Sequence, residues 1–281
     1  MTALAALAED GEPLIRWDWI GRNLSGDIAE SLREHLILSV TPVLLGLLIA
    51  LPVGLACARW RRIYPPVLAA TSVLYAVPAI GLFVIFVAFT GLTYPTVIVP
   101  LALYTLSVLV PSVVDGLRAV PDHVRQSAVA MGFGPLRRLV QVELPIAVPV
   151  LMAGLRVATV ANISLVSVGA LIGIGGLGQL MVKGMKWPGG GFTTPIIVAI
   201  VLIILLALVA DLLLLLVQRL LTPWERAGRG RRAGATDGAD SADGADGTKG
   251  ADGGTRAAAP GGTAGAAGDR AGTTAEPEEV R

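Results

Sequence analysis

The chain has 281 residues, of which 54% are hydrophobic and 15% are charged, and its mean hydropathy is +0.71. This balance is typical of a polytopic membrane protein and argues against a soluble globular domain. The single cysteine, Cys57, excludes a disulfide framework and any zinc-ligand spacing. Charged residues flank both histidines, His35 and His123, so we expect both to be ordinary surface residues.

Residues 1–35 are polar, and acidic side chains outnumber basic ones among them. The opening residues lack a basic region, and their apolar run is too short for the core of a signal peptide. Residues 24–34 can form a surface helix, with Trp17 and Trp19 at the level of the lipid headgroups. We expect residues 1–35 to form a solvated segment that leads into the first membrane span.

Five apolar stretches are long enough to cross the ~30 Å hydrocarbon layer, which takes about 20 helical residues. They cover residues 36–58, 66–89, 95–114, 146–172 and 195–217. Prolines inside them are tolerated in membrane helices, and their glycines allow close helix packing. The sequence therefore predicts an all-α membrane protein with five transmembrane helices, in a domain that spans residues 36–222.

Arginines gather after the first span, between the third and fourth spans, and after the fifth. These residues are Arg59, Arg61, Arg62, Arg118, Arg125, Arg137, Arg138, Arg219, Arg226, Arg229, Arg231 and Arg232. The alternate connections are poorer in basic residues, so the positive-inside rule places the N-terminus outside and the C-terminus in the cytoplasm. Residues 223–281 have almost no large apolar side chains, and we expect them to form a disordered cytoplasmic tail.

The cytoplasmic stretch 118–145 has the pattern of two short helices joined by a glycine turn. Pro121 suits the first turn of a helix, Gly132 stands where a left-handed helix end is expected, and Pro135 can open a second helix. In that second helix one side is mostly apolar, with Leu136, Leu139, Val140 and Glu143 at helical spacing. Such a helix pair between two membrane spans is typical of a docking element for another protein.

Ionisable residues within or beside the spans are candidates for function. Asp115 and Arg156 can each reach the membrane interface, or they can pair with one another. Asp211 lies in the fifth span, where Arg219 can accompany it two turns later. Asn162 can either bond across helices or line a path. The spans contain no regular series of acidic residues, which argues against a proton relay.

Residues 173–178 match the pattern G-x-G-x-x-G but follow a membrane helix, so we expect no dinucleotide site. Their glycines, Gly173, Gly175, Gly176 and Gly178, should instead break the helix and let residues 177–185 turn along the membrane surface as a gate. The sequence has no phosphate-binding loop, catalytic grouping or metal cluster. We therefore expect a subunit that is not an enzyme and binds no cofactor, so that energy for transport enters through another subunit.

One motif in the cytoplasmic stretch resembles the EAA loop of bacterial ABC importer permeases. It runs from Gln126 to Gly132, and Val142-Glu-Leu-Pro145 follows after nine residues. The resemblance implies that ATPase coupling involves Arg125, Gln126, Ser127, Ala128, Gly132, Arg137, Val142, Leu144 and Pro145. Gln126 replaces the usual glutamate and Ser127 the first alanine, so coupling should depend more on shape and on the neighbouring arginines.

Three further runs resemble the permeases of osmoprotectant importers, which carry glycine betaine, carnitine, choline or proline betaine. These runs cover residues 75–83, 143–164 and 169–184. The resemblance implies a bacterial inner-membrane permease that works as a dimer with a second copy or paralogue. Its other partners would be cytosolic ATPase subunits that carry ATP and Mg²⁺, and an external substrate-binding protein; nucleic acid is not among them.

A quaternary ammonium cation is held tightly by aromatic faces, and only 5% of this chain is aromatic. We therefore expect the tight site on the binding protein and only a weak passage here, lined by Tyr75, Phe83, Phe86, Tyr104 and Asn162. Three alternatives remain open: an ABC permease for another solute such as an amino acid, an ATPase-independent channel or carrier, and a membrane scaffold without transport.

Overall fold

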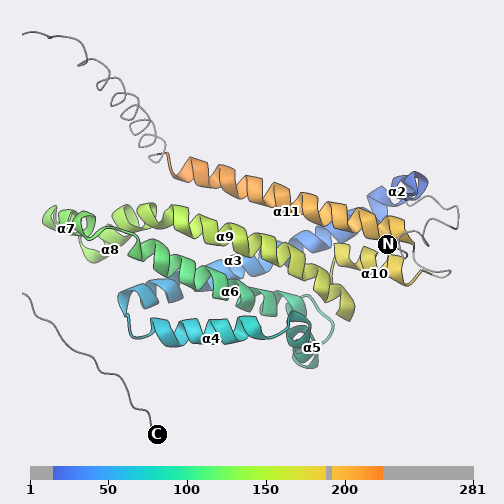
Figure 1. The fold of residues 1–281 in the computed structure, drawn as a ribbon, viewed down its shortest axis with the longest axis horizontal. Coiled ribbons are helices and arrows are strands. Elements are labelled where there is room, and N and C mark those ends of the chain that lie inside the picture. Colours follow the sequence, from blue (N-terminus) through green and yellow to red (C-terminus); the bar gives the residue numbers. More distant parts are fainter. Residues whose placement is uncertain (1–14, 188–191, 224–281) are drawn as a thin grey trace, which may run out of the picture. The chain divides into compact units, whose positions relative to one another are not determined.

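The computed structural model describes residues 15–187 and 192–223, and every regular element in those two ranges is a helix (Figure 1). Four helical segments are long and apolar enough to cross a bilayer, and a bent helix pair supplies a fifth crossing if its halves are counted together. The predicted all-α membrane fold is therefore confirmed. The predicted disordered tail lies outside the described residues apart from Pro223.

The first span is longer than its apolar core. Helix α2 (Trp17–Asn23) continues through the π-helical turn η1 (Leu24–Ile28) into α3 (Ala29–Arg59), with a break in helical geometry at Gly26. Residues 24–34 are helical as predicted, but residues 29–34 form the first turns of α3, so this helix is continuous with the first span. The reason is local: no proline or glycine stands between Ala29 and the apolar core, so the helix simply extends through these polar residues.

The second span, predicted as one stretch over 66–89, is broken. Helix α4 (Tyr64–Ala76) and helix α5 (Ala79–Thr90) meet at an angle of 93°. Pro78 has no amide hydrogen and forces Val77 into an extended conformation, with a ψ of 131°. The carbonyl of Val77 accepts a hydrogen bond from the Tyr104 hydroxyl at 2.5 Å, which satisfies a polar group at the break.

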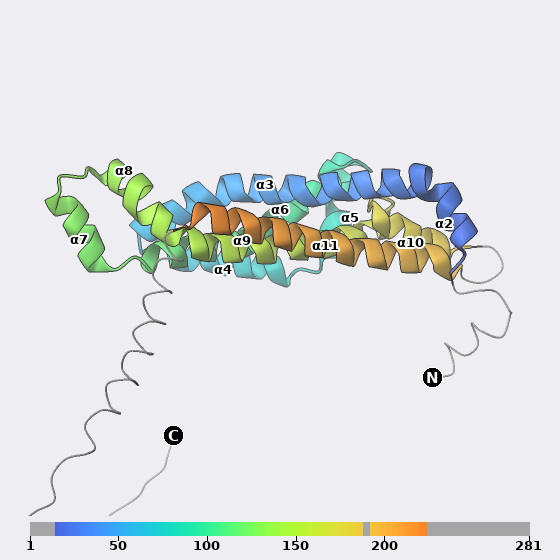
Figure 2. The same cartoon turned by 90° about the horizontal axis from the view of Figure 1, so that it is seen from above.

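Helix α6 (Pro95–Arg118) lies between its neighbours α3, α4 and α9 (Leu144–Val166) (Figures 1 and 2). Glycine allows the close approach of α3, because a Cβ atom on Gly46 would lie 2.4 Å from the Thr105 side chain. A Cβ atom on Gly54 would likewise lie 2.5 Å from Val113. Small residues at these crossings let membrane helices pack backbone to backbone. Such packing matters because the hydrophobic effect does not drive helices together in lipid.

Beyond α9 the chain passes through the 3-10 helix η3 (Ser167–Ile172) into α10 (Leu177–Met185), and then into α11 (Thr193–Leu221). Helix α10 packs against α11 and follows its direction in both views (Figures 1 and 2). The expectation that residues 177–185 turn along the membrane surface is therefore wrong. Leu177 and Leu180 are fully buried in a cluster with Ala199 of α11, which keeps the two helices side by side.

An ion pair joins α9 to α11 within the spans. The Arg156 guanidinium binds Asp211 through two bonds, Nε to Oδ1 at 2.7 Å and Nη2 to Oδ2 at 2.8 Å. The alternative in which Arg156 pairs with Asp115 is therefore wrong, and Asp211 has a partner 55 residues away in the sequence. Few α11 side chains are buried, and this bidentate, charge-assisted pair attaches the helix to α9.

Removing one charge of the Arg156–Asp211 pair is expected to destabilise the protein more than removing both. Asp211→Leu leaves an unpaired guanidinium among apolar groups, whereas the double variant with Arg156→Leu leaves no charge there. We expect several-fold less folded protein for the single variant after detergent extraction, with a lower thermal midpoint, and substantial recovery in the double variant. Fluorescence-detected size-exclusion chromatography after heating measures both; equal stability of the single variant and the native chain would contradict the prediction.

Candidate functional site

The connection between α6 and α9 projects from one end of the helices (Figures 1 and 2). It contains α7 (Asp122–Ala130), the short helix α8 (Pro135–Arg138) and the π-helical turn η2 (Leu139–Glu143), which runs directly into α9. Pro121 is extended and precedes α7, whose first turn carries Asp122 at the positive end of the helix dipole. The predicted helix pair is therefore present.

Gly132 ends α7 as the sequence predicts. Its φ is +80°, in the left-handed region that favours glycine. Its amide donates to the Val129 carbonyl at 2.9 Å, and the Phe133 amide donates to the Ala128 carbonyl at 3.0 Å. These two bonds are the pattern of a Schellman motif, which satisfies the last carbonyls of α7 and reverses the chain toward α8.

One carboxylate braces the two short helices. Glu143 Oε1 accepts a hydrogen bond from Arg138 Nε at 2.8 Å and lies 3.7 Å from Arg125 Nε. Arg125 also donates through Nη2 to the Leu117 carbonyl near the end of α6, at 2.5 Å. Together these contacts tie α7 to α6 and to the turn that begins α9, so the loop and both spans are mechanically connected.

The arginines of this loop are engaged within it. Arg137 Nε donates to Gln141 Oε1 at 3.0 Å, and the Arg137 guanidinium lies 4.7 Å from the centre of the Phe133 ring. Arg125 and Arg138 face Glu143, as above. Sequence reasoning placed Glu143 on the second helix but missed its bracing role, which the nearby basic residues of opposite charge could have suggested.

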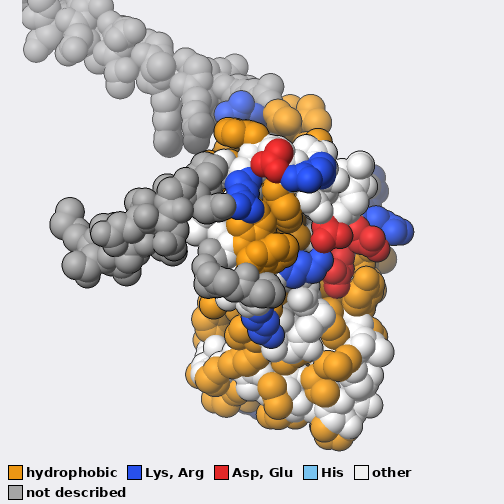
Figure 3. Space-filling model, turned by 90° about the vertical axis from the view of Figure 1, so that its right-hand side faces the viewer, with side chains coloured by type: hydrophobic (Ala, Val, Ile, Leu, Met, Phe, Trp, Pro, Cys, Tyr) orange, Lys and Arg blue, Asp and Glu red, His pale blue; other side chains and the backbone are white. Residues whose placement is uncertain are grey.

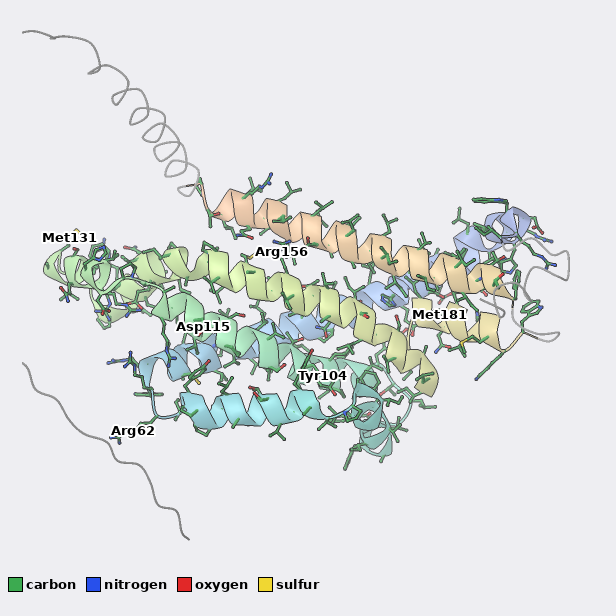
Figure 4. The ribbon with its side chains drawn as sticks, viewed as in Figure 1. Arg62, Tyr104, Asp115, Met131, Arg156 and Met181 are labelled. Carbon is green, nitrogen blue, oxygen red and sulfur yellow. The ribbon has the colours of Figure 1, made fainter. Side chains whose placement is uncertain are left out.

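The outer surface of the loop carries exposed apolar side chains. We call one group of exposed residues, Gln126, Val129, Met131, Leu136 and Val140, the docking face; the charged side chains of Asp122 and Arg137 are also exposed on the loop. Met131 lies at the tip of the loop (Figure 4) and its surface is 68% exposed. Ser127 is also exposed and donates to the His123 carbonyl at 2.9 Å, while Ala128 is buried. Clustered exposed apolar side chains are typical of a protein interaction site.

The remaining residues expected to couple to an ATPase lie where the loop joins α9. Val142, Leu144 and Pro145 are half-buried, and Pro145 lies at the start of α9, directly after the π-helical turn η2. They position the loop on the span and contribute less to its outer surface.

The predicted passage residues separate into two groups. The rings of Tyr75 and Tyr104 meet edge to face with centres 5.8 Å apart, beside the break between α4 and α5. Asn162 is buried and donates to Thr105 Oγ1 at 2.7 Å, so of its two possible roles the structure shows a bond across helices. Phe83 is fully buried in a hydrophobic cluster and lines no open surface.

Only Tyr75 among the passage residues is mainly exposed, with 57% of its surface accessible, and Phe86 is half-buried. The five side chains therefore do not line one open channel in this structure. Of the edge-to-face tyrosine pair, only the Tyr75 ring is available at the surface, because Tyr104 is buried.

The glycine segment after η3 packs against α3. Gly176 has a φ of +49°, and a Cβ atom on it would lie 2.6 Å from the His35 amide nitrogen. His35 is completely buried, and its Nε2 lies 2.9 Å from the Ile163 carbonyl oxygen. The surface assignment of His35 is therefore wrong, whereas His123 is exposed as predicted. Gly173 is the left-handed residue that ends η3, and Gly175 and Gly178 pack closely on Ala170 and Ser167.

The opposite end of the molecule carries mixed charge. Figure 3 shows basic and acidic side chains gathered over part of this end, with a largely hydrophobic flank below them. Asp18 pairs with Arg22 within α2, and Lys183 Nζ lies 2.9 Å from Asp27 Oδ2, which links α10 to η1. This end therefore has paired charges, in contrast to the basic loop end.

Comparison with known proteins identifies the family. The chain matches a protein family described as the binding-protein-dependent transport system inner membrane component. The match covers residues 44–223, which is more than half of the chain. The chain belongs to this family. It is therefore a multi-pass membrane protein, and the relatives it matches are permease subunits of transport systems rather than enzymes.

The curated relatives include two from Bacillus subtilis (strain 168). The glycine betaine/carnitine/choline transport system permease protein OpuCD is 34% identical over 62% of this chain and 75% of its own length. The choline transport system permease protein OpuBD is 33% identical over 61% and 75%. The osmoprotectant import permease protein OsmW of Salmonella typhimurium is 32% identical over 58% and 78%.

Among solved structures, an inward-facing form of the MetNI methionine ABC transporter matches with a TM-score of 0.63. The match covers 71% of this chain and 98% of that chain, at 23% identity. This likeness shows that the permease fold is shared. The loop between α6 and α9 lies within the residues that the family model matches.

Gly132→Ala is expected to destabilise the loop between α6 and α9 through backbone strain alone. A Cβ atom at Gly132 meets nothing within 4 Å, but a side chain in the left-handed region costs about 1–2 kcal/mol. Hydrogen exchange of peptides covering 122–138 should therefore accelerate about ten-fold. Gly134→Ala is the matched control, because Gly134 also has open space and its φ is −65°. Equal exchange in the two variants would contradict the prediction.

Gly176→Ala is expected to destabilise the contact between the glycine segment and α3. Gly173→Ala is its control, because Gly173 also has a positive φ but nothing within 4 Å of an added Cβ atom. Only the Gly176 variant meets the backbone of His35, which cannot move without displacing α3. We expect a clearly lower thermal midpoint for Gly176→Ala than for Gly173→Ala; midpoints lowered equally would show that the close contact adds nothing.

Proposed function

We propose that this chain is the membrane permease subunit of an ATP-driven importer for quaternary-ammonium osmoprotectants such as glycine betaine, choline and carnitine. The proposal is supported by the family match and by relatives that are named as permeases for these solutes. It is also supported by the exposed apolar docking face on the loop between α6 and α9. The partners we propose are a cytosolic ATPase that carries ATP and Mg²⁺, a second permease subunit, and an external substrate-binding protein. The loop end faces the cytosol, as the positive-inside rule predicts.

The proposed coupling uses the connections of the loop. When ATP closes the two ATPase subunits, the docking face moves with the cleft in which it sits. Because Glu143 bridges Arg125 and Arg138, and Arg125 also binds the Leu117 carbonyl, this displacement is passed to α6 and α9 together. The spans then open toward the outside, where the liganded binding protein releases the substrate.

Substrate selection is expected to depend mainly on the binding protein. A trimethylammonium group has no hydrogen-bond donor and is recognised through aromatic faces. Here the exposed Tyr75 ring offers a weak contact of this kind, whereas its edge-to-face partner Tyr104 and Phe83 are both buried. A passage with low affinity suits transport, because a site that bound tightly would retain the substrate.

The function is tested by uptake into proteoliposomes. The chain is reconstituted with the ATPase and the binding protein encoded beside its gene, and entry of radiolabelled glycine betaine, choline, carnitine and methionine is measured. We expect ATP-dependent uptake of at least one quaternary ammonium solute and none of methionine. Uptake of methionine alone would indicate an amino-acid importer, and uptake without the ATPase would indicate a channel or carrier; either result overturns the proposal.

The docking face is tested by a charge placed at its tip. Met131→Glu should strongly reduce co-purification of the ATPase, because a carboxylate would be buried in an apolar contact. Met185→Glu is the matched control, since Met131 and Met185 are 68% and 69% exposed and Met185 ends α10 at the other end of the molecule. If Met131→Glu retains the ATPase as well as Met185→Glu does, the assignment of the docking face is wrong.

A further inference from the structure

A cavity of about 630 Å³ lies at the loop end, and the coupling residues Arg125, Arg138 and Glu143 form part of its wall. Its walls come from the end of α3 and the turn after it, the end of α6, and the α8–η2 segment. Five arginines line it: Arg59, Arg61, Arg118, Arg125 and Arg138. Its volume is in the range of small-ligand sites, which are typically about 300–1,000 Å³.

The positive charge of this cavity is only partly neutralised. Glu143 is its one acidic lining residue and is already shared by Arg125 and Arg138. Within residues 15–187 and 192–223, Arg59, Arg61 and Arg118 have no carboxylate partner, although the Arg118 guanidinium lies 4.6 Å from the centre of the Tyr64 ring. Asp115, one turn before Arg118, does not line the cavity. The lining therefore has a charge excess of four that suits an anion.

The rest of the lining is apolar and comes from the ends of the membrane helices and from Pro135, Leu136 and Leu139 of the loop. Leu55, Ala56 and Ala58 come from the last turns of α3, and Leu117 comes from the last turn of α6. Trp60 directly follows α3, also lines the cavity and is 64% exposed. Tryptophan at the end of a membrane helix is typical of the headgroup level. The cavity therefore joins a cationic side to an apolar side at the membrane boundary.

From this arrangement we infer that the cavity binds an anionic phospholipid, with its phosphate among Arg59, Arg61 and Arg118 and its glycerol and upper acyl chains against the apolar wall. Basic pockets between membrane helices on the cytoplasmic side suit anionic headgroups. A soluble phosphate would leave the apolar half empty. The tip of the docking face, Met131, does not line the cavity, whereas Leu136 belongs to both surfaces.

A lipid in this position would connect two parts of the chain that meet at the cavity. Arg59 ends α3 and Arg61 belongs to the turn that follows it, whereas Arg125 and Arg138 belong to the loop between α6 and α9. A shared phosphate would reduce the repulsion among these arginines and hold the turn against the loop. Anionic lipid should therefore stabilise the loop end, and added salt should weaken this effect.

The test measures lipid binding to the purified full-length chain by native mass spectrometry, with dioleoylphosphatidylglycerol, dioleoylphosphatidylcholine and glycerol 1-phosphate as probes. The double variant Arg61→Gln/Arg118→Gln should weaken phosphatidylglycerol binding about thirty-fold. This factor corresponds to the loss of about 1 kcal/mol of attraction to the anionic headgroup for each arginine removed. Arg62→Gln with Arg137→Gln removes the same charge from the same end without touching the cavity lining, and it should bind as the native chain does.

Each other outcome overturns the inference. Equal loss in both double variants would show attraction by the general basic surface, equal binding of phosphatidylcholine would show no charge recognition, and displacement of the lipid by glycerol 1-phosphate would show a site for soluble anions. Co-purification of the ATPase that fails in the Arg61/Arg118 variant while lipid binding is unchanged would make the cavity a protein contact. These readouts need no transport, so they are independent of the proposed function.

A second measurement covers the case in which the double variant does not fold. Photoactivatable phosphatidylglycerol is cross-linked to the native chain in nanodiscs, and the labelled peptides are mapped by mass spectrometry. Labels are expected in residues 55–61 and 135–143, at the cavity walls. Labels distributed along the lipid-facing side of α11 without enrichment at these walls would contradict the site.

Discussion

The carboxylate of Glu143 is the interaction on which the arrangement of the loop end depends. It lies at the junction of η2 with α9 and holds Arg138 at 2.8 Å and Arg125 at 3.7 Å. Arg125 in turn binds the Leu117 carbonyl at the end of α6. Without this carboxylate, several arginines would face each other at a membrane boundary where repulsion is only weakly screened. The same bridge therefore shapes the docking face and leaves the rest of the positive charge around the cavity.

The spans beneath the loop are held by close packing and a few polar contacts. Gly46 and Gly54 bring α3 against α6, and Asn162 bonds to Thr105 between α9 and α6. Because lipid and apolar side chains are equally hydrophobic, such close contacts and interhelical bonds hold the helices together. The bidentate contact of Arg156 with Asp211 does the same for α11, few of whose side chains are buried.

The parts of the fold that depend on local sequence could be predicted. Apolar length predicts the spans, and the position of Gly132 predicts the left-handed end of α7. Pro78 shows the limit of this reasoning, because Pro42 and Pro52 lie inside a continuous α3 whereas Pro78 marks a 93° bend. What distinguishes it is the freed Val77 carbonyl, which binds a hydroxyl 27 residues away. A contact at that separation has no signal in a single sequence.

His35 and the Arg156–Asp211 pair show a second kind of limit. The charged neighbours of His35 suggested an exposed residue, but Ser31, His35, Leu38 and Ser39 share one helical face and all are buried. Helical spacing could have revealed this, whereas the flanking charges misled. For Arg156, composition identified a charge in need of a partner but left more than one acid available. The choice was made by the packing of α9 on α11, which sequence spacing does not specify.

The bracing of the arginines changes how Gln126 should be understood. If Arg125, Arg137 and Arg138 were free, they could replace the charge that a glutamate at position 126 would supply. Instead all three have partners within the loop, and the docking face is left with a neutral amide beside Val129, Met131, Leu136 and Val140. Association with an ATPase would then depend chiefly on apolar burial, which scales with area and is insensitive to salt. The salt dependence of this end would come chiefly from the neighbouring arginine-lined cavity, which shares Leu136 with the docking face.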